Sequence, residues 1–211
     1  MSALVTTVVM ATLVVGPFYL SGALDLDAAG VGLVMSAGPI VAALTGVPAG
    51  RIVDRFGAHR MTAVGLIAMA MGCAALPMVP IRFGIPGYVA PLMVITAGYA
   101  VFQAANNTAV MTGVQPEQRG VTAGLLTLSR NLGLITGASV MGAVFAWGTE
   151  ASDILTARPD AVRDGMRFTF FAATVLVVIT LGIATASRRA RSVQSASSCN
   201  WAKRRDDTAA R

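Results

Sequence analysis

The sequence predicts an all-α membrane protein, a polytopic bundle of six transmembrane helices. Only 12% of its 211 residues are charged and 55% are hydrophobic, whereas about a quarter of the residues in soluble domains are charged. The hydrophobic residues also form runs of about 20 residues, the length that a helix needs to cross a bilayer. Because these runs are apolar on all faces, they indicate helices and not the alternating strands of a membrane barrel.

Six segments have the required length and composition. They cover approximately residues 3–20, 31–49, 61–79, 87–111, 121–147 and 168–186. Together they predict a transmembrane bundle over residues 1–186, followed by a tail over residues 187–211.

The first segment has two interpretations. Ser21, Gly22 and Ala23, which follow it, are small residues of the kind found at the cleavage site of a signal peptide. However, no positive side chain precedes the segment, and its apolar part is longer than that of a usual signal peptide. We therefore expect a retained transmembrane helix.

Prolines lie within or at the ends of the first four segments. They are Pro17, Pro39, Pro48, Pro77 and Pro91. Proline lacks a backbone N–H and breaks a soluble helix, but in a membrane bundle neighbouring helices can satisfy the carbonyl that it leaves free. We expect these residues to mark kinks or bends.

Charged residues outside the spans predict the orientation. Positive residues gather around residues 51–60, at Arg119 and in the tail, whereas acids outnumber bases in the other loops. Because positive charges stay on the cytoplasmic side, both termini are predicted to be cytoplasmic in a bacterial inner membrane. The tail is rich in Ser and Ala and is expected to be disordered, contacting anionic lipid headgroups and no nucleic acid. Its cations include Arg188, Arg189, Arg191, Lys203, Arg204 and Arg205.

Several function classes are disfavoured by the residues. One histidine, His59, and two distant cysteines, Cys73 and Cys199, offer no metal-ligand cluster and predict no disulfide. The sequence also contains no G-x-S-x-G, H-E-x-x-H or phosphate-binding loop motif. We therefore expect neither enzymatic activity nor a metal or other cofactor.

The polar stretch GRIVDRFGAHR, residues 50–60, separates the second and third segments. Gly50 and Gly57 are expected to supply a tight turn, and Asp54 to cap the N-terminus of the next helix. Arg55 and Arg60 can pair with carboxylates or lipid phosphates. A generic loop needs glycine and positive charge, but it does not need this order.

This order resembles the cytoplasmic loop signature of the major facilitator superfamily, G-x-x-x-D-R-x-G-x-[HR]-R. In that family the signature lies between the second and third helices of a six-helix half, as it does here. PFYLSGALDLDAAGVGLVMSAGPI is similar to the helix pair before the loop in the drug-efflux branch. QPEQRGVTAGLLTLSRNLGLITGASVMGAVF looks like the penultimate helix of that branch, so the resemblance covers most of residues 15–147.

The resemblance implies one half of a larger transporter fold. Family members combine two six-helix bundles around a central cavity, and this chain is similar to the carboxyl-terminal bundle, with two inverted three-helix repeats. We expect a truncated product, a fragment, or one half of a split transporter that needs a second half or a homodimer. The resemblance assigns a gating latch to Asp54, with Arg55 and Arg60 as charge partners and Gly50 and Gly57 as the turn. The alternative is a loop that only orients the helices.

The fourth segment carries three carboxamides on one helical face. Gln103, Asn106, Asn107 and Val110 follow the spacing i, i+3, i+4 and i+7. Polar groups in hydrocarbon must face protein, water or a ligand. By resemblance this helix lines the central cavity, so the carboxamides are candidates for a substrate surface; interhelical hydrogen bonding is the alternative.

Arg130 is the only charged residue inside the predicted spans. A mid-membrane arginine costs about 2.5 to 3.5 kcal/mol on insertion scales. Its partner must be a backbone carbonyl, Asn106 or Asn107, water, an anionic substrate or an acid in an absent half. Substrate binding, structural hydrogen bonding and extension toward the cytoplasm all remain open. Because the spans contain no carboxylate, a proton carrier, if the transporter uses one, is expected in the other half.

Two glycine pairs in the fifth segment have the spacing of close-packed membrane helices. Gly120 and Gly124 form one pair, and Gly133 and Gly137 form the other. Both are predicted to be packing seams.

The sequence therefore predicts a half-length transporter for small molecules or drugs, embedded in the lipid bilayer and working by alternating access. The alternative is a truncated, non-transporting membrane protein or an interaction subunit.

Overall fold

The computed structural model describes residues 1–149 and 159–209. Its long helices are α1 (Ser2–Gly22), α2 (Ala28–Met35), α3 (Ala37–Phe56), α4 (Ala58–Ala75), α5 (Gly84–Met111), α6 (Arg119–Thr149) and α7 (Pro159–Ala209). Short 3-10 turns lie at η1 (Leu76–Met78), η2 (Ile81–Phe83) and η3 (Pro116–Gln118). The described residues contain no strand, so the all-α prediction is confirmed.

Six helical segments are long and apolar enough to cross a membrane. They are Ser2–Gly22, Ala28–Phe56, Ala58–Met78, Gly84–Met111, Pro116–Thr149 and Pro159–Ala186. Each contains one of the six predicted spans, except that the third predicted span extends one residue further, to Val79. The polypeptide is therefore a multi-pass membrane protein.

The second span is interrupted, and the hydrophobic pattern did not predict a break at this point. Helix α2 ends at Met35, and α3 begins at Ala37 after the single residue Ser36. Pro39, in the first turn of α3, has no N–H to donate to the preceding turn, so the hydrogen-bond ladder cannot continue unbroken. The Ser36 hydroxyl instead donates to the Leu33 carbonyl at 2.6 Å. The Asp27 carboxylate caps the start of α2 by accepting from the Gly30 N–H at 2.9 Å.

The helices pair in the way expected of two inverted repeats. The first repeat contains α1, the α2–α3 span and α4, and the second contains α5, α6 and α7. The first helix of each repeat contacts the second helix of the other, in the pairs α1–α6 and α5–α3. It also contacts the third helix of the other, in the pairs α1–α7 and α5–α4. This exchange is what a two-fold relation between the repeats requires.

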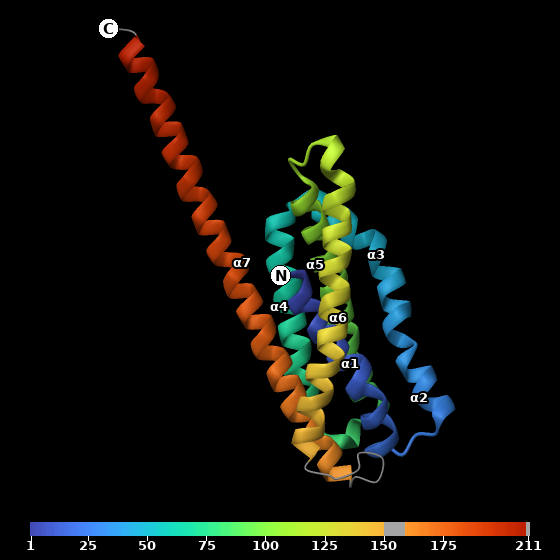
Figure 1. Cartoon of the computed structure of the whole chain (residues 1–211). Helices are drawn as coiled ribbons and strands as arrows, with labels where there is room; N and C mark the ends of the chain where they lie inside the picture. The colour runs from blue at the N-terminus through green and yellow to red at the C-terminus, as the bar shows by residue number, and fades with distance from the viewer. Residues whose placement is uncertain (150–158, 210–211) are drawn as a thin grey trace.

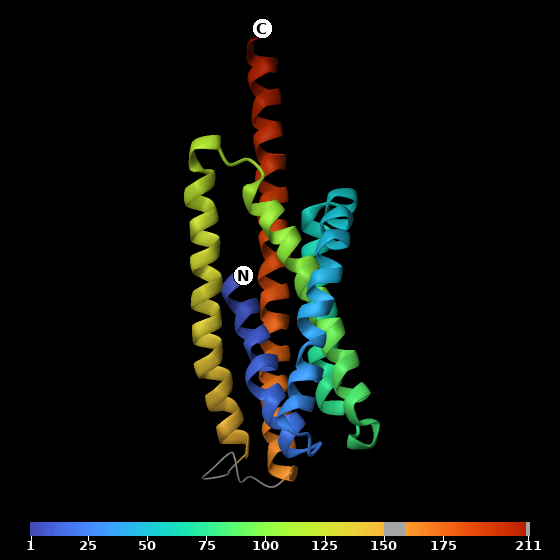
Figure 2. The same cartoon turned by 90° about the vertical axis from the view of Figure 1, so that its right-hand side faces the viewer.

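Helix α1 occupies the centre of the bundle and α2–α3 lies at its outside. Of the most apolar part of each span, 56% of the α1 residues are buried but only 11% of the α2–α3 residues. Val5, Val8 and Val15 of α1 are fully buried and belong to the same core as Phe145 of α6 and Phe170 of α7. Figure 2 shows α6 separated from α3 and α4, with α1 and α7 between them, while the upper end of α5 approaches α6.

The two ends of the bundle collect different loops. Gly57, residues 112–118 and the far end of α7 lie at one end, and the α1–α2 connection and the η1 and η2 turns lie at the other (Figure 1). The first end is the one predicted to be cytoplasmic. Helix α1 begins between the two ends of α6, beside α6 and α7 (Figure 2).

Helix α7 continues to Ala209 and projects beyond the other helices (Figure 1). The backbone of residues 187–209 is therefore helical where the composition of the tail predicts disorder. The physical reason is that this segment contains no Gly or Pro, and Ala, Arg, Lys and Gln favour helices. Contact of its cations with lipid headgroups stays a prediction.

Candidate functional site

The turn of the predicted gating loop is made by a single residue, Gly57. Gly57 ends α3 and begins α4, with φ +86° and ψ 138°. Its N–H donates to the Val53 carbonyl at 2.8 Å, which completes the last turn of α3. Side chains with a Cβ rarely adopt this conformation, so the predicted need for glycine is confirmed here.

Two local expectations for the same loop are wrong. Gly50 lies inside α3 and takes no part in the turn, because α3 continues for six more residues to Phe56. Asp54 lies in the last turn of α3, and no side chain caps α4. Helix α4 starts directly after Gly57, which leaves no linker from which Asp54 can reach its first N–H groups.

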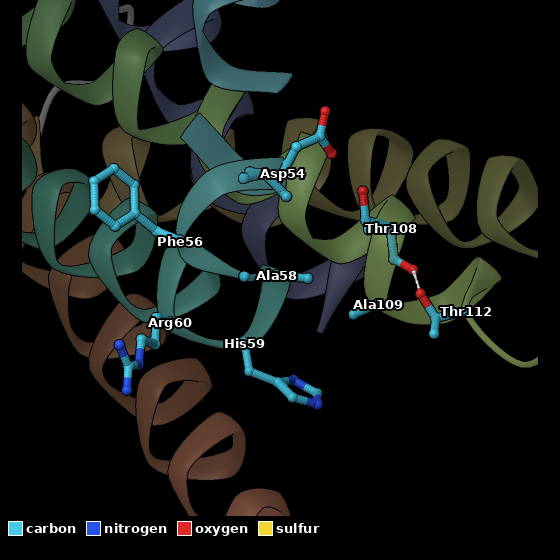
Figure 3. A pocket seen from close by; sticks show the side chains of 10 residues that line it. Asp54, Phe56, Ala58, His59, Arg60, Thr108, Ala109 and Thr112 are labelled. Carbon is cyan, nitrogen blue, oxygen red and sulfur yellow. Dashed lines mark hydrogen bonds between the residues drawn. The ribbon is translucent and has the colours of Figure 1, made fainter. Parts of the chain in front are cut away.

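A cavity of about 600 Å³ lies between this loop and the end of α5. It is lined by Val53, Asp54, Phe56, Gly57, Ala58, His59, Arg60, Thr108, Ala109 and Thr112 (Figure 3). The Thr112 hydroxyl donates to the Thr108 carbonyl at 2.7 Å. Asp54, His59 and Arg60 point in different directions (Figure 3), so they do not form one joint binding group.

The charged groups of the loop are exposed and unpaired within the part of the chain that the structure describes. Asp54 and Arg60 form no ion pair there. The Arg55 guanidinium instead lies 5.5 Å from the centre of the Phe56 ring. The Asp54 carboxylate is therefore available to a group outside the described residues.

A second polar group gathers where α1, α5 and α6 meet. An Arg130 N–H of α6 donates to Asn107 Oδ1 of α5. The Asn106 amide of α5 donates to the Ser2 hydroxyl of α1 at 2.9 Å. The Thr6 hydroxyl lies 3.3 Å from the Arg130 carbonyl oxygen, within donating distance. We call Ser2, Asn106, Asn107 and Arg130 the polar cluster.

The structure brings together three of the four predicted cavity residues. Asn106, Asn107 and Arg130 engage in these interhelical contacts, whereas Gln103 makes no hydrogen bond with the described residues. Of the partners that the sequence leaves open for Arg130, the structure shows the Asn107 carboxamide. All four side chains are half-buried. Helix α5 otherwise contacts α1 and α6 little, so polar contacts and not apolar packing connect these helices.

Sequence reasoning missed Ser2 and the hydroxyls of α1. Thr7 donates to the Gly133 carbonyl at 3.0 Å, beside the Thr6 contact. The available signal was the pair Thr6-Thr7 in an otherwise apolar helix, since threonine hydroxyls in membranes bond to neighbouring helices. A threonine can equally bond within its own helix, as Thr6 also does to Ser2 at 3.0 Å, and this made the signal weak.

Glycine seams hold the helices around the polar cluster. A Cβ on Gly137 would lie 2.7 Å from the Thr7 Cα, and one on Gly133 would collide with Thr6 and Ala3. The predicted seam at Gly133 and Gly137 is confirmed. A Cβ on Gly120 or Gly124 would meet no described atom within 4 Å, so the predicted seam there is wrong.

A further seam joins α4 to α5 and was not predicted. A Cβ on Gly65 would lie 2.7 Å from the Gly98 carbonyl oxygen, and one on Gly72 would lie 3.0 Å from the Pro91 carbonyl oxygen. Gly65 and Gly72 are seven residues apart and therefore share a helix face. The spacing of Gly65 and Gly72 in the sequence could therefore have predicted this seam.

A cavity of about 670 Å³ at the opposite end of the bundle is lined mainly by apolar residues of α4, η1 and α5. Its lining contains no charged side chain and suits lipid chains better than a polar ligand. The polar cluster and the Asp54 loop are therefore the candidate functional sites.

Six membrane helices in two inverted repeats, with polar groups between helices of the two repeats, define the class of secondary transporter bundles. The family model described as Major Facilitator Superfamily matches residues 1–199. The chain belongs to this superfamily.

Curated relatives are also transporters. The chain is 30% identical over 125 residues to the uncharacterized transporter YebQ of Escherichia coli, a match that covers 59% of this chain and 27% of the relative. It is 24% identical over 130 residues to the riboflavin transporter RibZ of Clostridioides difficile, covering 62% and 28%. It is 32% identical over 137 residues to a glucose/galactose transporter of Brucella abortus, covering 64% and 33%.

The chain spans about a third or less of the length of these relatives. Their names include a vitamin transporter and a sugar transporter, so they do not define one substrate class.

Proposed function

We propose that this chain forms one six-helix half of a secondary transporter that moves small molecules across a membrane by alternating access. The observation that carries the proposal is the polar cluster. It joins helices of both repeats inside the membrane spans, and transporters of this architecture bind substrate with polar groups at the interface between their repeats. Polar side chains at membrane depth are costly, and they are typical of transport pathways.

The second half is supplied either by another six-helix segment or by a second copy of this chain. The exposed Asp54 carboxylate supports this arrangement, because it has no partner among the described residues. In the proposed mechanism Asp54 engages the opposing half in one state and is released in the other. Membership of the drug-efflux branch is part of the proposal and is supported by the sequence resemblance.

Transport measurements test the cluster. Cells expressing the 211-residue chain, alone and with a candidate second half, are loaded with a fluorescent drug or with labelled riboflavin, and its loss or uptake is followed. Asn107→Leu is expected to reduce transport at least about tenfold with unchanged membrane insertion. The matched control is Asn131→Leu on exposed Asn131 of α6, which should retain transport. Equal transport by both variants would contradict a role for the cluster.

The latch is tested by removing one acid. Asp54→Asn is expected to abolish transport while the protein still inserts and folds. Glu117→Gln removes one exposed acid at the same end of the bundle and serves as the control. If no second half or homodimer restores transport of any probe, the chain is instead a non-transporting membrane protein or an interaction subunit.

Orientation is tested by reporter fusions. We propose that Gly57 and both termini face the cytoplasm of a bacterial inner membrane, because positive residues gather at that end. A phosphatase reporter that is active after Gly57 would reverse this orientation.

A further inference from the structure

Arg130 lies in the polar cluster without a carboxylate. The one ion pair within the described residues joins Arg167 and Asp164 of α7 at 3.7 Å, and both of these side chains are about half exposed. Arg130 instead lies inside the α6 span, level with the first turns of α1, and it is half-buried. A cation at such a depth is stabilised only by a partner. The neutral Asn107 side chain that accepts its hydrogen bond does not cancel the charge.

The contact also fixes which end of the Asn107 amide remains free. Arginine carries five N–H donors and no acceptor. Asn107 must therefore present its carbonyl oxygen to Arg130, and its NH2 group points elsewhere. The orientation of the Asn107 amide therefore follows from the chemistry of arginine.

The remaining hydrogen-bonding capacity of this pair consists of donors only. Arg130 keeps its other N–H groups and Asn107 keeps both N–H bonds of its NH2 group, since neither makes a second side-chain hydrogen bond among the described residues. The neutral Tyr99 phenol also lies within electrostatic reach of Arg130, and it brings no negative charge. The neighbouring Asn106 amide is occupied by the Ser2 hydroxyl. The pair is thus a positively charged, donor-only group, and a ligand that fits it carries acceptor oxygens and negative charge.

We propose that Arg130 and the NH2 group of Asn107 bind a carboxylate on the transported molecule. A carboxylate offers two oxygens to a guanidinium in a charge-assisted bidentate contact, which is stronger than a hydrogen bond between neutral groups. This inference rests on the proposed function, whose substrate class it specifies as small carboxylic acids in their ionised form.

A binding experiment tests the inference without requiring transport. The purified 211-residue chain is melted in detergent at constant ionic strength with benzoate or with benzamide. These probes have the same ring and nearly the same size, but only benzoate is charged. Benzoate is expected to raise the melting temperature at concentrations at least about tenfold lower than benzamide.

Two variants are expected to remove the preference for benzoate over benzamide by different means. Arg130→Gln deletes the charge. Asn107→Asp keeps a side chain of the same shape and supplies an internal carboxylate, so it should stabilise the unliganded protein and eliminate the response to benzoate. Asn131→Asp adds an acid next to Arg130 in the sequence but on exposed Asn131, and it should retain the benzoate response. If Arg130→Gln fails to fold, Asn107→Asp still decides the outcome.

The outcomes separate this inference from the proposed function. The inference is overturned by equal stabilisation by the two probes, by no stabilisation from either, or by an unchanged benzoate response in Asn107→Asp. Transport of neutral or cationic probes that persists in Arg130→Gln would also overturn it, while leaving the transporter proposal intact. If no variant or partner gives transport but the purified protein still prefers benzoate, the transporter proposal fails and the carboxylate site stands.

Discussion

Helix α6 contains two glycine pairs with identical spacing but different surroundings. Gly133 and Gly137 lie directly against α1, so that a methyl group on either would meet its backbone. Gly120 and Gly124, nearer the start of the helix, have no described atom within 4 Å of such a methyl group. The difference shows that glycine spacing permits close packing but does not cause it.

The difference follows from the position of α1. Its first residues, Ser2 and Ala3, lie at the level of Arg130 and Gly133, so the part of α6 before Arg130 extends past the described portion of α1. Three apolar side chains in that part of α6 are 55% to 68% exposed; they are Val121, Leu125 and Leu128. The close seam also aligns Thr6 and Thr7 with α6 carbonyls, and it thereby holds α1 against the polar cluster.

The most direct way to break the comparison is to add a branched side chain to each pair. Gly133→Val is expected to destabilise the protein by about 3 kcal/mol or more, because the new side chain collides with the Ala3 backbone as well as with the Thr6 hydroxyl. Gly124→Val should change stability by less than about 0.5 kcal/mol. Unfolding by denaturing detergent, followed by circular dichroism, measures both. Equal losses would mean that the second pair is also packed.

The seam between α4 and α5 extends the comparison to another helix pair. A Cβ on Gly98 would lie 2.9 Å from the Gly65 carbonyl oxygen. Gly98→Ala is expected to cost about 2 kcal/mol, because two backbones must separate to admit one methyl group. The control Gly182→Ala, in α7 with no described neighbour near its added methyl group, should be neutral or slightly stabilising. Thermal unfolding in detergent distinguishes them, and a neutral Gly98→Ala would refute the seam.

Two glycines of the loop motif, Gly57 and Gly50, allow the same kind of comparison for backbone conformation instead of packing. Gly57→Ala is expected to cost about 1 kcal/mol, since Gly57 has a positive φ of +86°. Gly50→Ala should instead stabilise the protein by about 0.5 to 1 kcal/mol, because Gly50 is helical and unobstructed. Opposite signs in the same unfolding assay are the expected result. Equal effects would mean that the motif does not turn at Gly57.

The smallest expected effect concerns the hydroxyls beside the close seam. Thr7→Val removes the hydrogen bond to the Gly133 carbonyl and should cost about 0.6 kcal/mol, the average for such bonds in membrane proteins. Thr127→Val removes a hydroxyl that bonds only within α6, to the Ala123 carbonyl at 3.0 Å, and should be nearly neutral. The difference between the two unfolding free energies is the quantity to measure. No difference would mean that interhelical hydroxyl bonds add nothing to the seam.

The candidate site was predictable in its residue types but not in its connections. Asn106, Asn107 and Arg130 stand out in the sequence because polar groups are costly in hydrocarbon. Which amide supports Arg130 depends on the rotation and offset of α5 against α6, and several alternatives were equally consistent with the sequence. The wrong prediction that Asp54 caps α4 has a similar cause, because it depended on the residue at which α3 ends.

The sequence alone determined the six spans, the polar loop at Gly57 and the depth of Arg130, because the bilayer imposes length and polarity on each segment independently of its neighbours. Only the tertiary structure decided that α1 is central, that α2–α3 lies outside, and that one glycine pair of α6 is packed while the other is open. The physical reason is that lipid and protein interior are similarly apolar, so the identity of a residue does not reveal which of the two it faces.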